Sequence, residues 1–156
     1  MGTPVYDRGV TLAMTALTVG HRVIDKVSGG RVGRRLGPGV PAVWLTTTGR
    51  RSGRLRRTPL VAARDGEAFL VAGSAGGRER GPAWVHNLRD HERRTEPVGL
   101  QDGESHHQAD VSELLGADRE RGFEKMVSVY SGFASYQRHT DRTIPVFRLM
   151  PRSQSP

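Results

Sequence analysis

Two Asp-Gly pairs, Asp65-Gly66 and Asp102-Gly103, restrict the fold of this chain more than any other feature of its sequence. Each pair lies between two runs of apolar and β-branched residues, a setting in which Asp-Gly is a strong signal for a tight β-hairpin. A hairpin joins antiparallel strands, whereas parallel strands need a long crossover connection. We therefore expect an antiparallel sheet or small barrel instead of a doubly wound parallel sheet.

The apolar pattern predicts an α+β fold of about six strands with three or four helices packed outside. The expected strands are residues 42–48, 56–64, 67–73, 98–101, 104–111 and 144–149. The expected helices are an amphipathic helix within 1–30, a short helix after Pro82 and a helix that Asp118 caps. A length of 156 residues suits one domain, here 31–151, followed by a polar tail over 152–156.

The positive charge of the chain is concentrated in one stretch. Lys and Arg total 24 against 16 acids, and ten of the bases lie between Lys26 and Arg64, where no acid occurs. Elsewhere 14 bases are set against all 16 acids, so the net charge of +8 comes from that stretch alone. Such a local excess indicates a defined anionic partner. The absence of cysteine excludes disulfides and thiolate chemistry, and it fits a cytoplasmic location.

Residues 49–57 form the densest part of this stretch, a glycine-bounded turn between two expected strands. It carries Arg50, Arg51, Arg54, Arg56 and Arg57. Backbone amides freed at a turn, surrounded by guanidinium groups, suit a phosphate or several carboxylates. A solvated edge hairpin is the structural alternative, but five arginines without an acid favour anion binding. Charge alone does not distinguish nucleic acid from a small anionic cofactor.

Three further groups are candidate site residues. The glycine-rich segment 73–77 should lack regular structure and would allow close approach to a flat ligand, with Ser74 as a hydrogen-bonding group. Trp84 and Asn87 lie one helical turn apart on the same face. Tyr130, Phe133 and Tyr136 are spaced three apart among small residues, which favours a lid segment over a packed core helix.

The remaining polar residues suggest no further chemistry. His106 and His107 are adjacent on an expected strand, so their side chains point to opposite faces and cannot share a metal. No metal site is therefore expected. The pair Asp141-Arg142 is interpreted as a local ion pair or a cap at the start of the last strand.

Three strings in order resemble the deazaflavin-dependent nitroreductase and quinone reductase family, over roughly residues 28–151. They are LTTTGRRSGRLRRTPLV, VAGSAGGRERGPAWVHNL and YSGFASYQRHTDRTIPVFRL. The resemblance implies a split β-barrel of the flavin-binding type. It also implies that the cofactor is reduced coenzyme F420, a 5-deazaflavin with a phosphate and an oligoglutamate tail.

The resemblance also implies roles for individual residues. The cofactor would contact Arg50, Arg51, Ser52, Arg56, Pro59, Leu60, Ser74, Ala75, Gly76, Gly77, Trp84 and Asn87. The substrate would contact Val61, Tyr130, Phe133 and Tyr136. Ser74 would polarise the acceptor oxygen, and Tyr130 and Tyr136 would donate a proton or orient the substrate. Three positions depart from the family pattern, because Ala75 replaces a common lysine, Val61 an aromatic residue and Phe133 a tyrosine.

The expected function is hydride transfer from reduced coenzyme F420 to an electron-poor small molecule such as a quinone, an enone or lactone, or a nitroaromatic. One alternative is the same fold binding flavin mononucleotide (FMN) or another ligand. A second is a basic nucleic-acid-binding module, which is less expected because aromatic residues are only 6 % and are not interleaved with the bases. The sequence leaves open the oligomeric state and whether the N-terminal helix contacts a membrane surface.

Overall fold

The structure is a computed structural model that describes residues 39–153. The expected N-terminal helix, the bases from Lys26 to Arg35 and the last three residues of the polar tail lie outside the described residues. No helix within 39–153 is long and apolar enough to cross a membrane.

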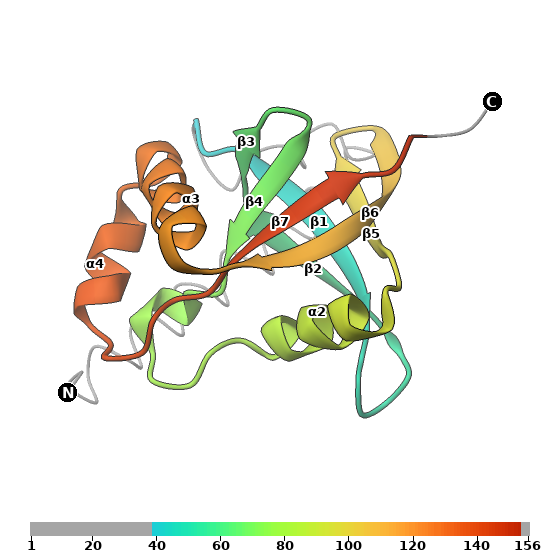
Figure 1. Cartoon of the computed structure of the whole chain (residues 1–156), viewed down its shortest axis with the longest axis horizontal. Helices are drawn as coiled ribbons and strands as arrows, with labels where there is room; N and C mark the ends of the chain where they lie inside the picture. Colours follow the sequence, from blue (N-terminus) through green and yellow to red (C-terminus); the bar gives the residue numbers. More distant parts are fainter. Residues whose placement is uncertain (1–38, 154–156) are drawn as a thin grey trace.

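The described residues form one antiparallel sheet of seven strands, in the order β2-β1-β5-β6-β7-β4-β3 (Figure 1). The strands are β1 (Ala42–Thr48), β2 (Leu55–Val61), β3 (Ala63–Asp65), β4 (Ala68–Ala72), β5 (Val98–Asp102), β6 (Ser105–Leu114) and β7 (Val146–Pro151). The predicted α+β class and the antiparallel pairing are confirmed. The strand count exceeds the expected six because the strand expected over 56–64 is divided in two.

That division closes the sheet into a split β-barrel. Strand β2 pairs with β1 at one edge of the sheet, and β3 pairs with β4 at the other edge. Only Ala62 separates the two strands, and its N–H donates a 3.1 Å hydrogen bond to the carbonyl of Pro41. Because the chain passes from one edge to the other within a single residue, the sheet must curl until its edges meet.

Both predicted Asp-Gly hairpins are present. Asp65 pairs with Ala68, and Asp102 pairs with Ser105, so each hairpin has a two-residue loop that begins with glycine. The glycines take φ values of +62° and +60°, a left-handed conformation that favours a residue without a Cβ. The pairing register of four strands therefore follows from two short sequence signals.

Three α-helices pack outside the sheet in the described part of the chain, α2 (Ala83–Arg94), α3 (Gly116–Val129) and α4 (Gly132–Arg138). Figure 1 shows α3 and α4 at one end of the sheet and α2 below it. The prediction that Asp118 caps its helix is wrong, because α3 begins at Gly116 after Leu115. Asp118 lies instead in the first turn, where a carboxylate complements the helix dipole.

The apolar core has two parts, which lie on opposite faces of β4 and β7. The first lies under α2 and includes Leu88, Leu100 and Phe147. The second lies under α3 and α4 and includes Met126 and Phe133. Phe133 is only 4 % exposed, so it is a core residue and not part of a free lid as the sequence suggested.

Candidate functional site

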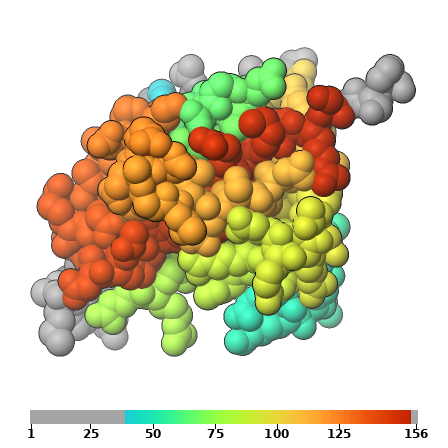
Figure 2. Space-filling view, viewed as in Figure 1, coloured from blue at the N-terminus to red at the C-terminus, as the bar shows by residue number. Residues whose placement is uncertain are grey.

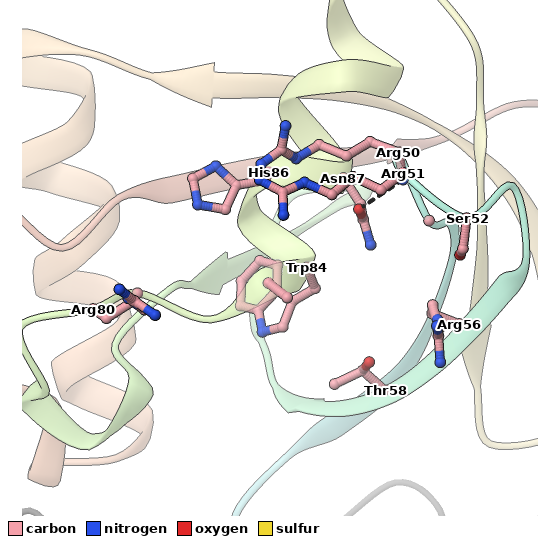
Figure 3. Close-up of a pocket in the computed structure, with 12 residues that line it drawn as sticks. Arg50, Arg51, Ser52, Arg56, Thr58, Arg80, Trp84, His86 and Asn87 are labelled. Atoms are coloured by element: carbon pink, nitrogen blue, oxygen red, sulfur yellow. Dashed lines mark hydrogen bonds between the residues drawn. The ribbon is translucent and has the colours of Figure 1, made fainter.

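An open cavity of about 870 Å³ lies between the β1–β2 turn (residues 49–54) and the start of α2. Figure 2 shows the surface hollowed there, and Figure 3 shows the side chains that surround the hollow. The lining residues are Gly49, Arg50, Arg51, Ser52, Arg56, Thr58, Arg80, Gly81, Ala83, Trp84, His86 and Asn87. The residues from Gly49 to Thr58 come from the β1–β2 turn and β2, and those from Arg80 to Asn87 come from α2 and the segment before it.

The cavity is strongly cationic. Four of its lining residues are arginines, and none is an aspartate or glutamate. Arg50 and Arg51 project from the β1–β2 turn and Arg56 from β2, whereas Arg80 lies beyond Trp84 (Figure 3). Like charges that face one cavity without a carboxylate repel each other and stabilise a bound anion. We call this feature the cationic cavity.

Strand alternation decides which arginines of the turn reach the cavity. Arg56 and Thr58, two residues apart on β2, share a face and line it. Arg57 points to the other face, where its guanidinium lies 4.2 Å from the ring centre of Trp44 and hydrogen-bonds to Gln101. The sequence predicts that all five arginines of residues 49–57 surround one anion. Only Arg50, Arg51 and Arg56 line the cavity, and these are the three to which the family resemblance assigns cofactor binding.

Helix α2 fixes the end of β1 and the turn through two buried side chains four residues apart. Asn87 accepts a hydrogen bond from the N–H of Arg50 at 3.1 Å and donates one to the hydroxyl of Thr47 at 3.3 Å. His91 Nε2 accepts from the N–H of Thr48 at 3.0 Å. Asn87, predicted as a cofactor contact, thus both lines the cavity and positions its wall.

The β1–β2 turn is also held by its own backbone. The N–H of Gly49 donates to the carbonyl of Arg54, and the N–H of Gly53 donates to the carbonyl of Gly49, both at 2.8 Å. A Cβ at Gly49 would lie 2.7 Å from the hydroxyl of Ser52 and 3.3 Å from the carbonyl oxygen of Arg54, so a larger residue there would displace the Ser52 side chain. The arginine side chains therefore project from a preorganised backbone.

Replacing Asn87 by alanine is expected to lower the free energy of unfolding by about 1–3 kcal/mol, because the buried hydroxyl of Thr47 and the partly buried N–H of Arg50 lose this partner. Chemical denaturation followed by tryptophan fluorescence measures this loss. His86→Ala, on the exposed face of the same helix, should change stability by less than about 0.5 kcal/mol. Equal losses in the two variants would contradict the anchoring role of Asn87.

A second group of predicted residues lies outside the cavity lining, in the loop of residues 73–78 that follows β4. Residues 73–77 are buried, and Ala75–Gly77 form a single 3-10 turn in place of the expected irregular segment. Ser74 is 5 % exposed, and its hydroxyl makes no capping hydrogen bond to this turn. The predicted glycine-rich loop is therefore an ordered part of the interior.

The four predicted substrate residues come together beside this loop. Val61, Tyr130 and Tyr136 pack against the same apolar cluster that contains Phe133. The hydroxyls of Tyr130 and Tyr136 lie 3.1 Å apart, within hydrogen-bonding distance. Helix α4 contacts the 3-10 turn, and a Cβ at Gly77 would lie 2.5 Å from the carbonyl oxygen of Tyr136. The tyrosines and the 73–78 loop thus form one compact region.

The predicted cofactor residues are divided between the cationic cavity, strand β2 and the 73–78 loop. Arg50, Arg51, Ser52, Arg56, Trp84 and Asn87 line the cationic cavity. Pro59 is buried in β2, and Leu60 packs against the first core cluster. Leu60 shares the strand face of Arg56 and Thr58, so β2 leads from the cavity toward Val61 and the tyrosine region.

Sequence reasoning missed several lining residues, of which Thr58, Arg80 and His86 carry polar side chains. Period-two alternation from Arg56 could have found Thr58, whereas no local pattern marks Arg80 or His86. The interpretation of Asp141-Arg142 as a local ion pair is also wrong. The guanidinium of Arg142 donates instead to the backbone carbonyls of Gly73, Ser74 and Arg78.

The donor groups of the cationic cavity fit a long polyanion better than a single small anion. Arg56 and Arg80 lie on opposite sides of the indole of Trp84, and the side chains of Arg50 and Arg51 extend from the turn in the direction of His86 (Figure 3). Guanidinium groups bind both phosphate and carboxylate oxygens through paired N–H donors. A phosphate joined to a chain of carboxylates, as in coenzyme F420, matches this arrangement.

A curled antiparallel sheet with a cationic cavity at one edge defines a split-barrel protein with a site for an anionic ligand. Within that class, the chain belongs to the F420H(2)-dependent quinone reductase family, whose sequence model matches residues 19–151.

Individual relatives agree with this assignment. The F420H(2)-dependent quinone reductase Rv1261c of Mycobacterium tuberculosis is 32 % identical over 138 residues, covering 85 % of this chain and 88 % of that protein. A solved F420-H2 dependent reductase, FDR-A, superposes with a TM-score of 0.63 at 34 % identity, covering 72 % of this chain and 99 % of the other. A solved domain-swapped dimer matches with a TM-score of 0.65 at 31 % identity, covering 84 % and 96 %.

Proposed function

We propose that this protein is a reductase that uses reduced coenzyme F420 to reduce a quinone-type small molecule. The observation that carries the proposal is the cationic cavity, where four arginines and no carboxylate face a space large enough for a polyanionic tail. Family membership makes coenzyme F420 the expected cofactor. FMN and nucleic acid, the alternatives from sequence, gain no comparable support.

In this proposal Arg50, Arg51 and Arg56 bind the phosphate and the carboxylates of the cofactor tail. Ser52 assists them from the same turn. The turn is already fixed by Asn87 before binding, so little backbone order has to be created when the anion arrives. The indole of Trp84 offers an apolar wall that packs on Phe147 behind it, with ring centres 6.2 Å apart. Arg80 adds a cation at the far end of the cavity.

The reduced deazaflavin, when bound, supplies a hydride to the acceptor. A quinone that gains a hydride needs one further proton to become a hydroquinone. Tyr130 and Tyr136 are the proposed source of that proton, because their hydroxyls are hydrogen-bonded to each other and either can donate. Ser74 is the proposed donor to the acceptor oxygen.

The remaining predicted residues are proposed to shape the site. Pro59, Leu60 and residues 75–77 flank the cofactor, Val61 lines the substrate space, and Phe133 supports that space from the core by packing edge-on against Tyr130 and Tyr136. Their apolar surfaces exclude water from the hydride-transfer step. Valine and phenylalanine at these two positions leave the tyrosine hydroxyls as the polar groups of the aromatic cluster.

Rapid mixing of the protein with reduced coenzyme F420 and a panel of quinones tests the proposal, with enones and nitroaromatics as further acceptors. Oxidation of the deazaflavin, followed by absorbance, is expected with at least one quinone. A parallel titration with FMN should show weaker binding. Absence of both cofactor binding and oxidation, or preferential binding of FMN, would contradict the proposed function.

A further inference from the structure

The 73–78 loop has a backbone conformation that its own sequence does not enforce. Ala75, Gly76 and Gly77 all have positive φ, at +47°, +66° and +80°. For Ala75 this conformation costs about 1–2 kcal/mol relative to a right-handed one. Ser74 immediately before it is right-handed, with φ −73° and ψ −36°. Surrounding residues must therefore hold the loop in this conformation.

Arg142 is the side chain that holds it. Its Nε donates to the carbonyl of Arg78 at 2.9 Å, and its two terminal nitrogens donate to the carbonyls of Gly73 at 3.0 Å and Ser74 at 2.7 Å. These partners lie at both ends of the loop and 64 to 69 residues away in sequence. Burial lowers the pKa of the Arg142 guanidinium, and the nearby Arg78 charge lowers it further.

Arg142 is itself fixed from α3 and α4. Gln137 of α4 donates to the carbonyl of Arg142 at 2.8 Å and accepts from the N–H of Ile144 at 3.1 Å. Arg119 of α3, only 7 % exposed, donates to Gln137 at 3.0 Å and to the carbonyl of Ile144. The loop and the helix that carries Tyr136 are thus joined through one hydrogen-bonded network.

The hydrogen bonds from Arg142 to the carbonyls of Gly73 and Ser74 also determine which way the N–H groups of the same peptide units point. All described peptide bonds are trans, so each N–H points away from the carbonyl of the same peptide group. Because the carbonyls of Gly73 and Ser74 face Arg142, the N–H groups of Ser74 and Ala75 face the other way. Successive right-handed and left-handed residues bring such N–H groups together into a concave anion site.

We propose that Arg142 is a positioning residue for the reductase site: it orients the N–H groups of Ser74 and Ala75 toward an oxygen of the bound deazaflavin cofactor. This inference rests on the proposed function. Arg142 acts only through the loop and touches neither cofactor nor substrate. Lysine cannot reproduce its role, because one ammonium group cannot reach three carbonyls in the geometry of the planar guanidinium.

Amide NMR spectra of the nitrogen-15 labelled protein, titrated with reduced coenzyme F420, test this directly. In the unmodified protein the amide protons of Ser74 and Ala75 should move downfield on binding. In Arg142→Lys that movement should be lost, and the dissociation constant of the cofactor should rise about tenfold. The matched control is Arg148→Lys, which alters an arginine bonded to Asp65 and should bind normally.

The outcomes separate the inference from the function on which it rests. If other amides respond to the cofactor while those of Ser74 and Ala75 do not, the inference is wrong and the reductase proposal stands. An Arg142→Lys protein that loses thermal stability but keeps its cofactor affinity would also overturn it. If no amide responds, the proposed function fails, and the inference with it.

Discussion

The double variant Arg50→Ala/Arg56→Ala is expected to bind reduced coenzyme F420 about 30-fold more weakly than the unmodified protein. Both side chains line the cationic cavity, and both are exposed before the ligand arrives. A hydrogen bond to a charged group contributes about 1.5–3 kcal/mol when it is desolvated, and exposure reduces this to about 1 kcal/mol for each arginine. Two such losses give the stated change in affinity.

The control for this experiment lies on the same turn. Arg54 is exposed and does not line the cavity, so Arg54→Ala should leave the affinity almost unchanged. Fluorescence titration at several salt concentrations measures both variants, and the salt dependence of binding should be weaker in the double variant because fewer charges meet the ligand. A loss in Arg54→Ala as large as that in Arg50→Ala/Arg56→Ala would indicate a diffuse basic surface instead of a defined site.

Salt-dependent retention on DNA gives a second, independent check. The nucleic-acid alternative predicts that retention survives loss of Arg50 and Arg56, because the remaining arginines of the basic stretch would still contact phosphates. The cofactor proposal predicts little retention at physiological salt in either protein. Strong retention in both would contradict it.

Gly77→Ala is expected to destabilise the protein by about 3 kcal/mol or more. The residue has φ +80°, where an L side chain is strained by about 1–2 kcal/mol. Its new Cβ would also lie 2.5 Å from the carbonyl oxygen and 3.0 Å from the Cα of Tyr136, both backbone atoms that cannot turn aside. Overpacking of this kind costs a further 1–3 kcal/mol or so. The midpoint temperature of thermal unfolding should therefore fall by about 10 °C.

A second glycine distinguishes the strain of a positive φ from the steric clash of the new Cβ. Gly66 has a similar φ of +62°, but a Cβ there would meet nothing within 4 Å. Gly66→Ala should therefore cost only the conformational part, about 1–2 kcal/mol. Similar losses in the two variants would show that the close approach of the loop to α4 contributes nothing to stability. The same contact keeps Tyr136 next to the 73–78 loop, so Gly77→Ala should also lower turnover.

Local sequence signals predicted much of the fold because their physical basis is local. An Asp-Gly pair between apolar runs sets a hairpin wherever it occurs, and both hairpins formed at the expected residues. The strand over 42–48 was also predicted with its full bounds. The division of the next strand at Ala62 was not, because only the closure of the sheet requires β2 and β3 to pair with opposite edges.

The sequence likewise predicted only part of the candidate site. Sequence and family resemblance selected Arg50, Arg51 and Arg56, which do line the cationic cavity. They could not find Arg80 or His86, since those residues reach the cavity only because α2 packs beside the β1–β2 turn. Arg142 was interpreted through its sequence neighbour Asp141, whereas its partners lie more than 60 residues away.

By itself, the sequence determined an antiparallel sheet, a concentrated positive charge on one turn and membership of a deazaflavin reductase family. These properties depend on residues near one another in the chain. The tertiary structure decided which arginines share a cavity, which side of the 73–78 loop is available and which tyrosines meet. Those outcomes depend on contacts between distant segments, and only the closed, packed barrel brings those segments together.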